Sequence, residues 1–598
     1  MPTSRRARPF FIAPSFIAAA SLALGSLGPA CQRAPERSVV GAQRSDPSLA
    51  AEATDRSAAP VEAEAPAPTA GPVALPATLA PEPAPRQQLA RPAPVLAARR
   101  ATQLQAMPAI SGLAGAPPAA EGEAYAARAD VGFASVESEP LSTFSIDVDT
   151  ASYSNVRRFI QQGRLPPPGA VRIEELVNYF PYAYPDPQGD EPIGVSTELS
   201  RAPWNTDHLL LQVALQGRRL ETAQLPPRNL VFLLDVSGSM QAANKLPLLK
   251  RSLMALTETL GERDRVAMVV YAGASGVVLP PTSGRDKAQI GAALERLEAG
   301  GSTNGGAGIE LAYAIATELA RPGASTRVIL ATDGDFNVGA TSEDALVRLI
   351  AARRAGGVFL SVLGFGMGNY KDATLERLAD EGNGNYAYVD SLAEARKVLV
   401  AEGGATLVTL AQDVKLQLEF NPRHVGSYRL IGYENRRLDT ADFNDDRKDA
   451  GELGAGQRVT ALYELIPLGQ PAPQASVDPL RYRSLGAAAG PADELCTIKL
   501  RYQAPGASGS RASERHVSTA AAALDETSPA FRFAAAVATF GMVLRRSPER
   551  GTSDYRLARE LARGALGRDL DGYQHELIGL IDGAAALDHG TPGPLAMP

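Results

Sequence analysis

The sequence predicts an α/β fold: a doubly wound domain with an open parallel sheet, inserted in a β-sandwich-like flanking domain. Strand-like and helix-like segments alternate between Asn229 and Val400, which is the pattern of a parallel sheet with helices on both faces. Strand-like segments without intervening helices stand on either side of this stretch. The chain has 598 residues, 45% of them apolar, which is enough for roughly three to four domains with substantial cores.

The first residues have the composition of an export signal. An arginine-rich start precedes an apolar stretch that ends just before Cys31. The segment LGPAC at residues 27–31 is similar to the bacterial lipoprotein cleavage site, although Gly28 stands where that site has an aliphatic residue. We expect residues 1–31 to be a signal peptide that ends in lipidation of Cys31, with plain secretion or a retained membrane anchor as alternatives. No later segment is apolar for long enough to span a bilayer.

Residues 32–138 are rich in Ala, Pro, Glu and Arg and contain almost no aromatic residues. Such a composition cannot bury a core, so it predicts a disordered, partly extended tether. Behind a lipidated cysteine, this tether would hold the folded part away from the membrane, which predicts an exported, membrane-anchored lipoprotein on the periplasmic or outer-membrane face of the envelope. A leader without a role of its own is the alternative.

Residues 139–227 are expected to form an N-terminal flanking domain. Its predicted elements are a short strand and turn at Ser142–Thr150, helices at Tyr153–Gln162 and Arg172–Phe180, and strands at Val195–Leu199 and Leu209–Leu215. We expect the last two strands to pair with strands that follow the α/β domain. The α/β domain would then be inserted within a sandwich.

Residues 228–402 are expected to form the α/β domain. Its continuous apolar runs are typical of buried parallel strands, and its helical spacing lies between them. The predicted strands are Leu230–Leu234, Arg265–Tyr271, Val328–Ala331, Val358–Leu363 and Tyr386–Val389. The predicted helices are Leu246–Leu260, Lys287–Leu297, Gly308–Leu319, Glu343–Arg354, Asp372–Asp380 and Leu392–Val400.

Residues 403–505 are expected to form a β-rich flanking domain, and residues 525–590 a small helical region. The predicted strands are Thr409–Phe420, Tyr428–Gly432, Val459–Ile466 and Cys496–Tyr502. The predicted helices are Pro529–Arg545, Tyr555–Leu566 and Tyr573–Ala586.

The composition argues against several function classes. The formal net charge is −7 without a basic patch, so nothing favours a nucleic-acid partner. Cys31 and Cys496 differ so much in context that a disulfide between them is not expected. The five histidines are scattered without a zinc-type spacing.

Oxygen-bearing side chains follow two predicted strands and one glycine-rich loop. Asp235, Ser237 and Ser239 come at the end of the first strand, Thr303 lies in the loop, and Asp333 follows a later strand. Ligands bind at the carboxyl ends of strands in an open α/β sheet, so we expect these side chains to converge there. Two carboxylates and three hydroxyls suit Mg²⁺, Mn²⁺ or Ca²⁺ rather than zinc or copper. Because hydroxyls are neutral ligands, the cation would keep enough charge to bind an Asp or Glu carboxylate of a partner.

These five positions resemble the metal-ion-dependent adhesion site, or MIDAS, of von Willebrand factor type A (VWA) domains. In that family the serines and the threonine contact the metal, and the aspartates often act through water. Residues 144–151, 332–339, 450–452 and 459–464 are similar to a bacterial subfamily often called YfbK-like, which carries its own flanking domains. The resemblance covers about residues 141–587. It implies a Rossmann-like VWA fold, a divalent cation, foremost Mg²⁺, and a protein partner, with no small-molecule cofactor.

The leading hypothesis is therefore a metal-ion-dependent protein-binding or adhesion module at the cell envelope, and not an enzyme. One alternative is an envelope structural or assembly protein in which the metal only stabilises the VWA fold. Another is a metal-assisted hydrolase, although Ser237 is not in a Gly-x-Ser-x-Gly elbow and no general base is evident nearby. A vestigial site, whose residues merely cap turns and helices, is the last alternative.

Three other patterns favour structural interpretations. Residues 147–150 (DVDT) resemble the nucleophile motif of haloacid dehalogenase-type phosphatases, but an Asp-turn with a helix cap is the simpler interpretation. The glycines in residues 364–368 lack the spacing of a dinucleotide loop and predict a flexible turn. The acidic residues between 442 and 452 partly mimic a calcium loop, yet Arg447 stands where such a loop needs glycine, so a solvated turn is expected.

Overall fold

The structure is a computed structural model that describes residue 125 and residues 129–589, apart from 147–148, 222–223, 304, 335–342, 368–371, 404–407, 449, 472–490 and 508. All of these belong to one compact unit. The predicted signal segment, the lipidation of Cys31 and most of the predicted tether lie outside the described residues. The predicted end of the tether at residue 138 is wrong, because Ala134–Ser135 form a strand and the apolar side chains of Phe133 and Val136 are buried. Within the described residues, no helix has both the length and the apolar character needed to cross a membrane.

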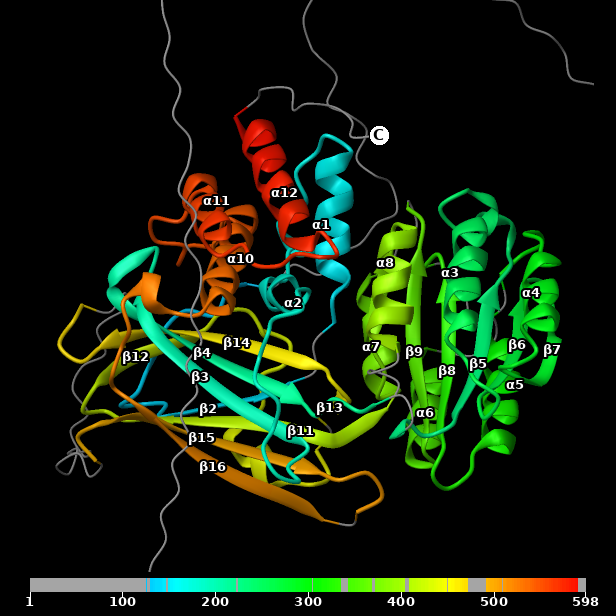
Figure 1. The fold of residues 1–598 in the computed structure, drawn as a ribbon, viewed down its shortest axis with the longest axis horizontal. Helices are drawn as coiled ribbons and strands as arrows, with labels where there is room; N and C mark the ends of the chain where they lie inside the picture. The colour runs from blue at the N-terminus through cyan, green and yellow to red at the C-terminus, as the bar shows by residue number, and fades with distance from the viewer. Residues whose placement is uncertain are drawn as a thin grey trace, which may run out of the picture. The chain divides into compact units, whose positions relative to one another are not determined.

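Two antiparallel sheets form the β-sandwich (Figure 1). The first sheet has the order β1 (Ala134–Ser135), β12 (Val425–Leu430), β14 (Arg458–Pro467), β4 (Asn205–Gly217) and β3 (Ile193–Ala202). The second has the order β13 (Gly451–Gly454), β11 (Thr409–Phe420), β15 (Glu494–Gln503) and β16 (Ser510–Ser518), and β2 (Leu141–Ser145) pairs with β11. Their inner faces share one apolar core. Strand β4 lies beside β14, with Leu211 opposite Tyr463, so the predicted pairing of strands before and after the α/β domain is confirmed.

The inserted domain has a six-stranded sheet in the order β10 (Tyr386–Val389), β9 (Val358–Phe365), β8 (Ser325–Thr332), β5 (Arg228–Asp235), β6 (Arg265–Tyr271) and β7 (Ser275–Ser283). The predicted strands are confirmed. Strand β7, which pairs antiparallel with β6, was not predicted. It carries Pro280 and Pro281, and prolines are tolerated only on a strand that lies at the edge of a sheet. The short strand β13 and the exposed strand β16 were also missed.

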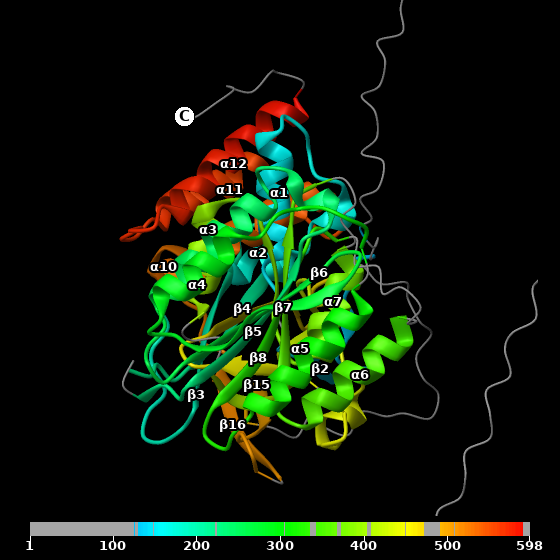
Figure 2. The same cartoon turned by 90° about the vertical axis from the view of Figure 1, so that its right-hand side faces the viewer.

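Helices cover both faces of this sheet, as predicted (Figure 2). The residues of one apolar core come from α3 (Leu246–Glu258), α4 (Lys287–Glu295) and α8 (Leu392–Arg396). The residues of the other come from α5 (Gly306–Leu319), α6 (Glu343–Ala355) and α7 (Asp372–Glu381). Because both faces are covered, β5 is buried at every position, which explains its unbroken apolar run.

The predicted C-terminal helices are present as α10 (Pro529–Arg545), α11 (Tyr555–Gly564) and α12 (Tyr573–Asp588). They share one core with two N-terminal helices, α1 (Ala151–Gln161) and α2 (Ile173–Asn178). The small helical unit is thus built from both ends of the folded chain (Figure 1). Sequence periodicity identifies an apolar helix face but not the helix that covers it.

Asp149 joins the sandwich to the inserted domain. Its side chain is buried, accepts a hydrogen bond from the backbone N–H of Tyr386 at 2.7 Å, and pairs with Arg436 at 3.1 Å. Thr150, the residue that caps α1, makes no side-chain capping bond. Thr150 therefore does not supply the predicted cap, and the neighbouring Asp149 carboxylate is used across the junction. Asp147 of the predicted Asp-turn lies outside the described residues.

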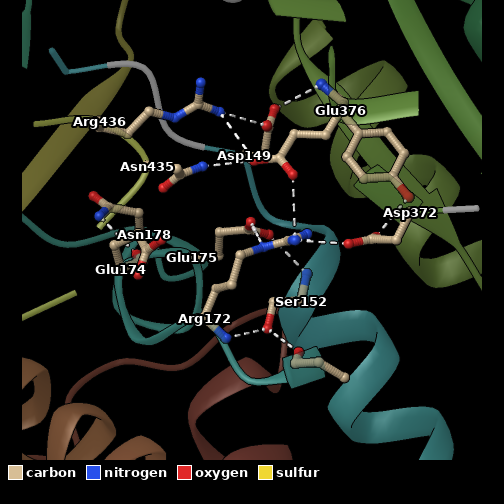
Figure 3. A network of polar contacts seen from close by, with 12 residues as sticks. Asp149, Ser152, Arg172, Glu174, Glu175, Asn178, Asp372, Glu376, Asn435 and Arg436 are labelled. Carbon is tan, nitrogen blue, oxygen red and sulfur yellow. Dashed lines mark hydrogen bonds and ion pairs between the residues drawn. The ribbon is translucent and has the colours of Figure 1, made fainter. Parts of the chain in front are cut away.

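A network of arginines and carboxylates continues this junction (Figure 3). Arg172, just before α2, pairs with Glu175 of the same helix and reaches Asp372 at 2.6 Å and Glu376 at 3.3 Å on α7. All of these side chains are buried. Buried charges are tolerated only when they are paired, so this network fixes how α7 packs on the flanking helices.

Candidate metal centre

Two neighbouring parallel strands end side by side at the candidate site. In the register of β5 and β8, Leu234 lies opposite Ala331, so Asp235 and Asp333 leave the sheet at the same edge. Both carboxylates are almost completely buried. This register brings carboxylates from two separate stretches of the chain to the carboxyl ends of neighbouring strands, where ligands bind in open α/β sheets.

Asp235 is held in one orientation by three donors. Its Oδ1 accepts a hydrogen bond from the Ser237 backbone N–H at 2.9 Å. Its Oδ2 accepts hydrogen bonds from the Tyr271 hydroxyl at 3.1 Å and the Thr332 hydroxyl at 3.2 Å. Burial raises the pKa of Asp235 above its usual value, and the negative charge of Asp333 raises it further. The two carboxylates thus repel each other electrostatically, as expected of anions that share one site.

The two serines lie together on the turn that follows β5. Ser237 precedes the short 3₁₀ turn Gly238–Gln241, and its hydroxyl oxygen lies 3.0 Å from that of Ser239. Ser237 is buried, whereas Ser239 is exposed. The alternate spacing therefore places two neutral oxygen donors at the same point, one of them open to solvent.

The loop that carries Thr303 packs against this turn through its backbone. The Gly238 N–H donates to the Gly301 carbonyl at 3.1 Å, and the Gly300 N–H donates to the Val236 carbonyl at 2.8 Å. Thr303 follows two residues later and is half-buried. Among the described residues, no hydrogen bond joins its hydroxyl to the other four predicted ligands. The structure thus brings four side chains to one strand edge and the Thr303 loop beside them.

Lys245 belongs to this site and was missed by the sequence interpretation. Its Nζ donates to Asp333 Oδ2 at 2.8 Å, and the side chain is only 12% exposed. The aliphatic part of Lys245 crosses Gly366, where any side chain would collide with it. Gly366 also has a φ of +79°, so its turn conformation, as well as this close approach, favours glycine. A lysine directly before a helix gave no sequence signal for a partner that lies 88 positions later.

The donor set fits a hard cation that prefers oxygen ligands. Two buried carboxylates and paired hydroxyls converge, while no grouping of three or more His, Cys, Asp or Glu side chains suited to a metal occurs in the described part of the chain. Burial keeps the pKa of Tyr271 well above its usual value, so this phenol stays protonated and donates to Asp235. The chemistry is that of Mg²⁺, Mn²⁺ or Ca²⁺ and not that of zinc.

The acidic loop near residue 445 is engaged in surface ion pairs. Asp445 pairs with Arg447 at 2.8 Å, and Asp446 pairs with Arg501 at 2.7 Å. The hydrogen bonds from Arg447 lower the pKa of Asp445. Arg447, the residue that departs from the calcium-loop pattern, thus supplies a positive charge to the turn, and Lys448 supplies another beside Asp442.

Comparisons with known proteins match the three folded parts of the chain. Residues 229–400 match the family model of the von Willebrand factor type A domain. Residues 405–587 match the C-terminal family of the uncharacterized protein YfbK, and residues 119–212 match a family described as von Willebrand factor.

One curated relative supports the assignment to the YfbK family. The uncharacterized protein YfbK of Escherichia coli (strain K12) is 45% identical over 456 residues, which are 75% of this chain and 78% of that protein. The uncharacterized protein sll0103 of Synechocystis sp. is 27% identical over 190 residues, 32% of this chain and 44% of its own length. Among solved structures, von Willebrand factor type A from Catenulispora acidiphila is 16% identical and covers 65% of this chain and 88% of its own, with a TM-score of 0.37.

Proposed function

The chain belongs to the YfbK family of VWA-domain proteins, and we propose that it is a metal-ion-dependent protein-binding module. A divalent cation, foremost Mg²⁺, would be held by Asp235, Ser237, Ser239, Thr303 and Asp333. VWA domains commonly mediate protein–protein interactions. The proposal specifies that this chain does so through the cation, with an Asp or Glu carboxylate of the partner as the ligand.

The observation that carries the proposal is the charge balance at the strand edge. Asp235 and Asp333 are both buried there, and the Lys245 ammonium pairs with only one of them. Adjacent buried carboxylates cost free energy unless a cation compensates them. The neighbouring hydroxyls of Ser237 and Ser239 are suitable ligands for that cation and add no charge.

When bound, the cation supplies a Lewis-acidic position at which a partner carboxylate can coordinate. The side chains of the site prepare that position. Tyr271 and Thr332 keep Asp235 from turning away, and exposed Ser239 marks the side from which a partner can approach. We propose binding without turnover, because Asp235 is committed to three donors and Asp333 to Lys245, so neither is set up as a general base.

The proposed location is the cell envelope. It rests on the arginine-rich start, the apolar stretch and the lipobox-like segment that ends at Cys31. Lipidation of Cys31 and a tether over the residues between it and the start of the sandwich would place the binding module at a distance from the membrane. A plain secreted protein is the alternative, and mass spectrometry of the mature N-terminus distinguishes the two.

The test compares the full chain with Asp333→Ala in metal binding and partner capture. Calorimetric titration of the EDTA-treated protein with Mg²⁺ should show one site in the wild type and none in the variant. Pull-down from an envelope extract should recover a partner with Mg²⁺ but not with EDTA, and the variant should recover none. Asp207→Ala, an exposed acid on β4, is the matched control and should behave as the wild type.

A structural role for the metal is the second candidate, because the junction network already shows that this protein uses buried charges to hold its parts together. Under that candidate, Asp333→Ala lowers the melting temperature while capture of the partner is retained. Under our proposal, capture is lost, and the metal-free melting temperature falls only by what the broken Lys245–Asp333 ion pair contributes. Turnover that a chelator abolishes would contradict both.

A further inference from the structure

A polar cavity lies at the opposite edge of the α/β sheet, where the sheet meets the sandwich. Its volume of about 160 Å³ is far more than the ~10–15 Å³ that one water needs. The inserted domain contributes Arg327 and Asn383, and the sandwich contributes Arg437 and Glu452. Arg327 stands near the start of β8, and Asp333 directly follows the end of that strand. The cavity and the candidate metal centre are therefore separate sites.

Arg327 is the unusual residue of this cavity. It is only 2% exposed, yet no carboxylate of the described residues lies within the 4.0 Å that defines an ion pair. Its Nη1 donates to the Ser361 hydroxyl at 2.7 Å, and its Nε is buried without a hydrogen-bond partner. Burial lowers the pKa of Arg327 to about 10, so the group remains charged at neutral pH.

Two other buried arginines of the chain, Arg172 and Arg429, have carboxylate partners. Arg172 has a carboxylate at 2.6 Å, and Arg429 has one at 2.6 Å as well. A guanidinium buried without an ion-paired anion is expensive because its charge loses hydration. Among the described residues, Arg327 is compensated by the attraction of Glu452, which lies beyond ion-pair distance, and by the Phe359 ring, whose centroid lies 5.6 Å from Cζ. Arg327 thus has unused capacity for an anion, and it lines a cavity large enough to hold one.

The remaining charges of the cavity leave a positive balance. Asp380 is already paired with Arg436 at 2.7 Å. Glu452 accepts a hydrogen bond from Asn383 at 2.6 Å, and Arg437, which is exposed, has no ion pair within the described part of the chain. Arg327 and Arg437 therefore face one carboxylate, that of Glu452, which leaves one positive charge in excess.

We propose that this cavity is a binding site for a small oxyanion, a phosphate or a small carboxylate, held by Arg327. The planar guanidinium fork suits both classes, because each presents two oxygens to parallel N–H donors. Arg437 at the exposed side adds a second positive charge, and Asn383 can donate from the wall. The site does not depend on the proposed metal centre, since the two lie at opposite ends of β8.

The test measures binding of inorganic phosphate, sulfate, acetate and malonate to the full chain in EDTA, at constant ionic strength. We expect one oxyanion class to raise the melting temperature and to titrate calorimetrically with one site per chain. Arg327→Met should weaken that binding at least about tenfold, the loss typical of a charge-assisted pair. Arg511→Met, an exposed arginine on β16, is the control and should leave binding unchanged. The phosphate and carboxylate arms identify the ligand class.

Two milder variants keep the proposal testable if Arg327→Met fails to fold. Glu452→Gln removes a like charge and should tighten oxyanion binding, whereas Arg437→Gln should weaken it by a few-fold. The proposal is overturned if the wild type binds none of the four anions at millimolar concentration, if Arg327→Met binds them unchanged, or if Glu452→Gln weakens the binding.

Discussion

The junction network and the candidate metal centre both bury carboxylates beside a cationic side chain, but the other donors at the two places differ. At the junction, Arg172 reaches three carboxylates of two different parts of the chain. At the strand edge, Lys245 pairs with Asp333, whereas Asp235 has no ion pair among the described residues and accepts hydrogen bonds from the hydroxyls of Tyr271 and Thr332.

This difference separates groups that hold the fold together from groups that can bind something else. An arginine placed between several carboxylates is already saturated, so an added cation gains little there. Carboxylates that are held by neutral hydroxyls keep their negative charge available. The kind of donor beside an acid, more than the number of acids, therefore distinguishes a structural network from a candidate cation site.

The largest effect is expected from breaking the junction. Arg172→Met leaves Glu175 and Asp372 buried without their cationic partner, which should cost ~3–5 kcal/mol of unfolding free energy. Urea denaturation measures the loss. Arg219→Met removes an exposed pair with Asp186 and should cost at most ~1 kcal/mol. Equal losses in the two variants would show that the junction network is not structural.

The pH dependence of stability should also report on the junction. Burial raises the pKa of Glu175 to about 7, against the opposing charge of Arg172. The folded state then keeps a proton that the unfolded state releases, so this residue's contribution is most favourable below its usual pKa of about 4.5 and falls until the pH exceeds about 7. The decline is on the order of 3 kcal/mol.

Urea denaturation between pH 4 and pH 8, compared for the wild type and Glu175→Gln, isolates this contribution. The variant cannot titrate at this position, so its stability should fall less than that of the wild type as the pH rises. Parallel curves for the two proteins would contradict the assignment.

A divalent metal ion should stabilise the folded chain by binding at the candidate metal centre. At a Mg²⁺ concentration one hundred times the dissociation constant, linkage predicts a gain of ~2.7 kcal/mol in the wild type. Asp235→Asn should abolish the gain, because a carboxylate ligand is lost. Asp207→Asn, an exposed acid, should keep it. A gain of equal size in Asp235→Asn would mean that Mg²⁺ binds elsewhere.

The smallest effect is expected from Lys245→Met, which tests the role of this side chain at the candidate metal centre. Its ammonium competes with an added cation for Asp333, so Lys245→Met should tighten Mg²⁺ binding about tenfold, or ~1.4 kcal/mol. Calorimetric titration measures the change, and Lys448→Met, a surface lysine, is the control. Weaker binding in Lys245→Met would show that the ammonium supports the cation site instead of competing with it.

The fold was largely predictable because its signals are local. The buried run before Asp235 and the alternation of strands and helices indicated a parallel sheet, and the order of elements indicated insertion into a sandwich. Strand β7 escaped prediction because its prolines oppose strand formation, and only its place at the sheet edge makes them acceptable.

The sequence by itself determined which residue types stand at the ends of β5 and β8, since strand ends and turn residues are encoded within a few positions. Only the tertiary structure decided which distant charges meet them. Lys245 reaches Asp333 across 88 positions, Asp149 reaches Tyr386 across 237, and Arg327 is enclosed by a sandwich that its own segment does not specify. Periodicity and turn chemistry act over a few residues, whereas burial and electrostatic pairing depend on which segments the fold brings together.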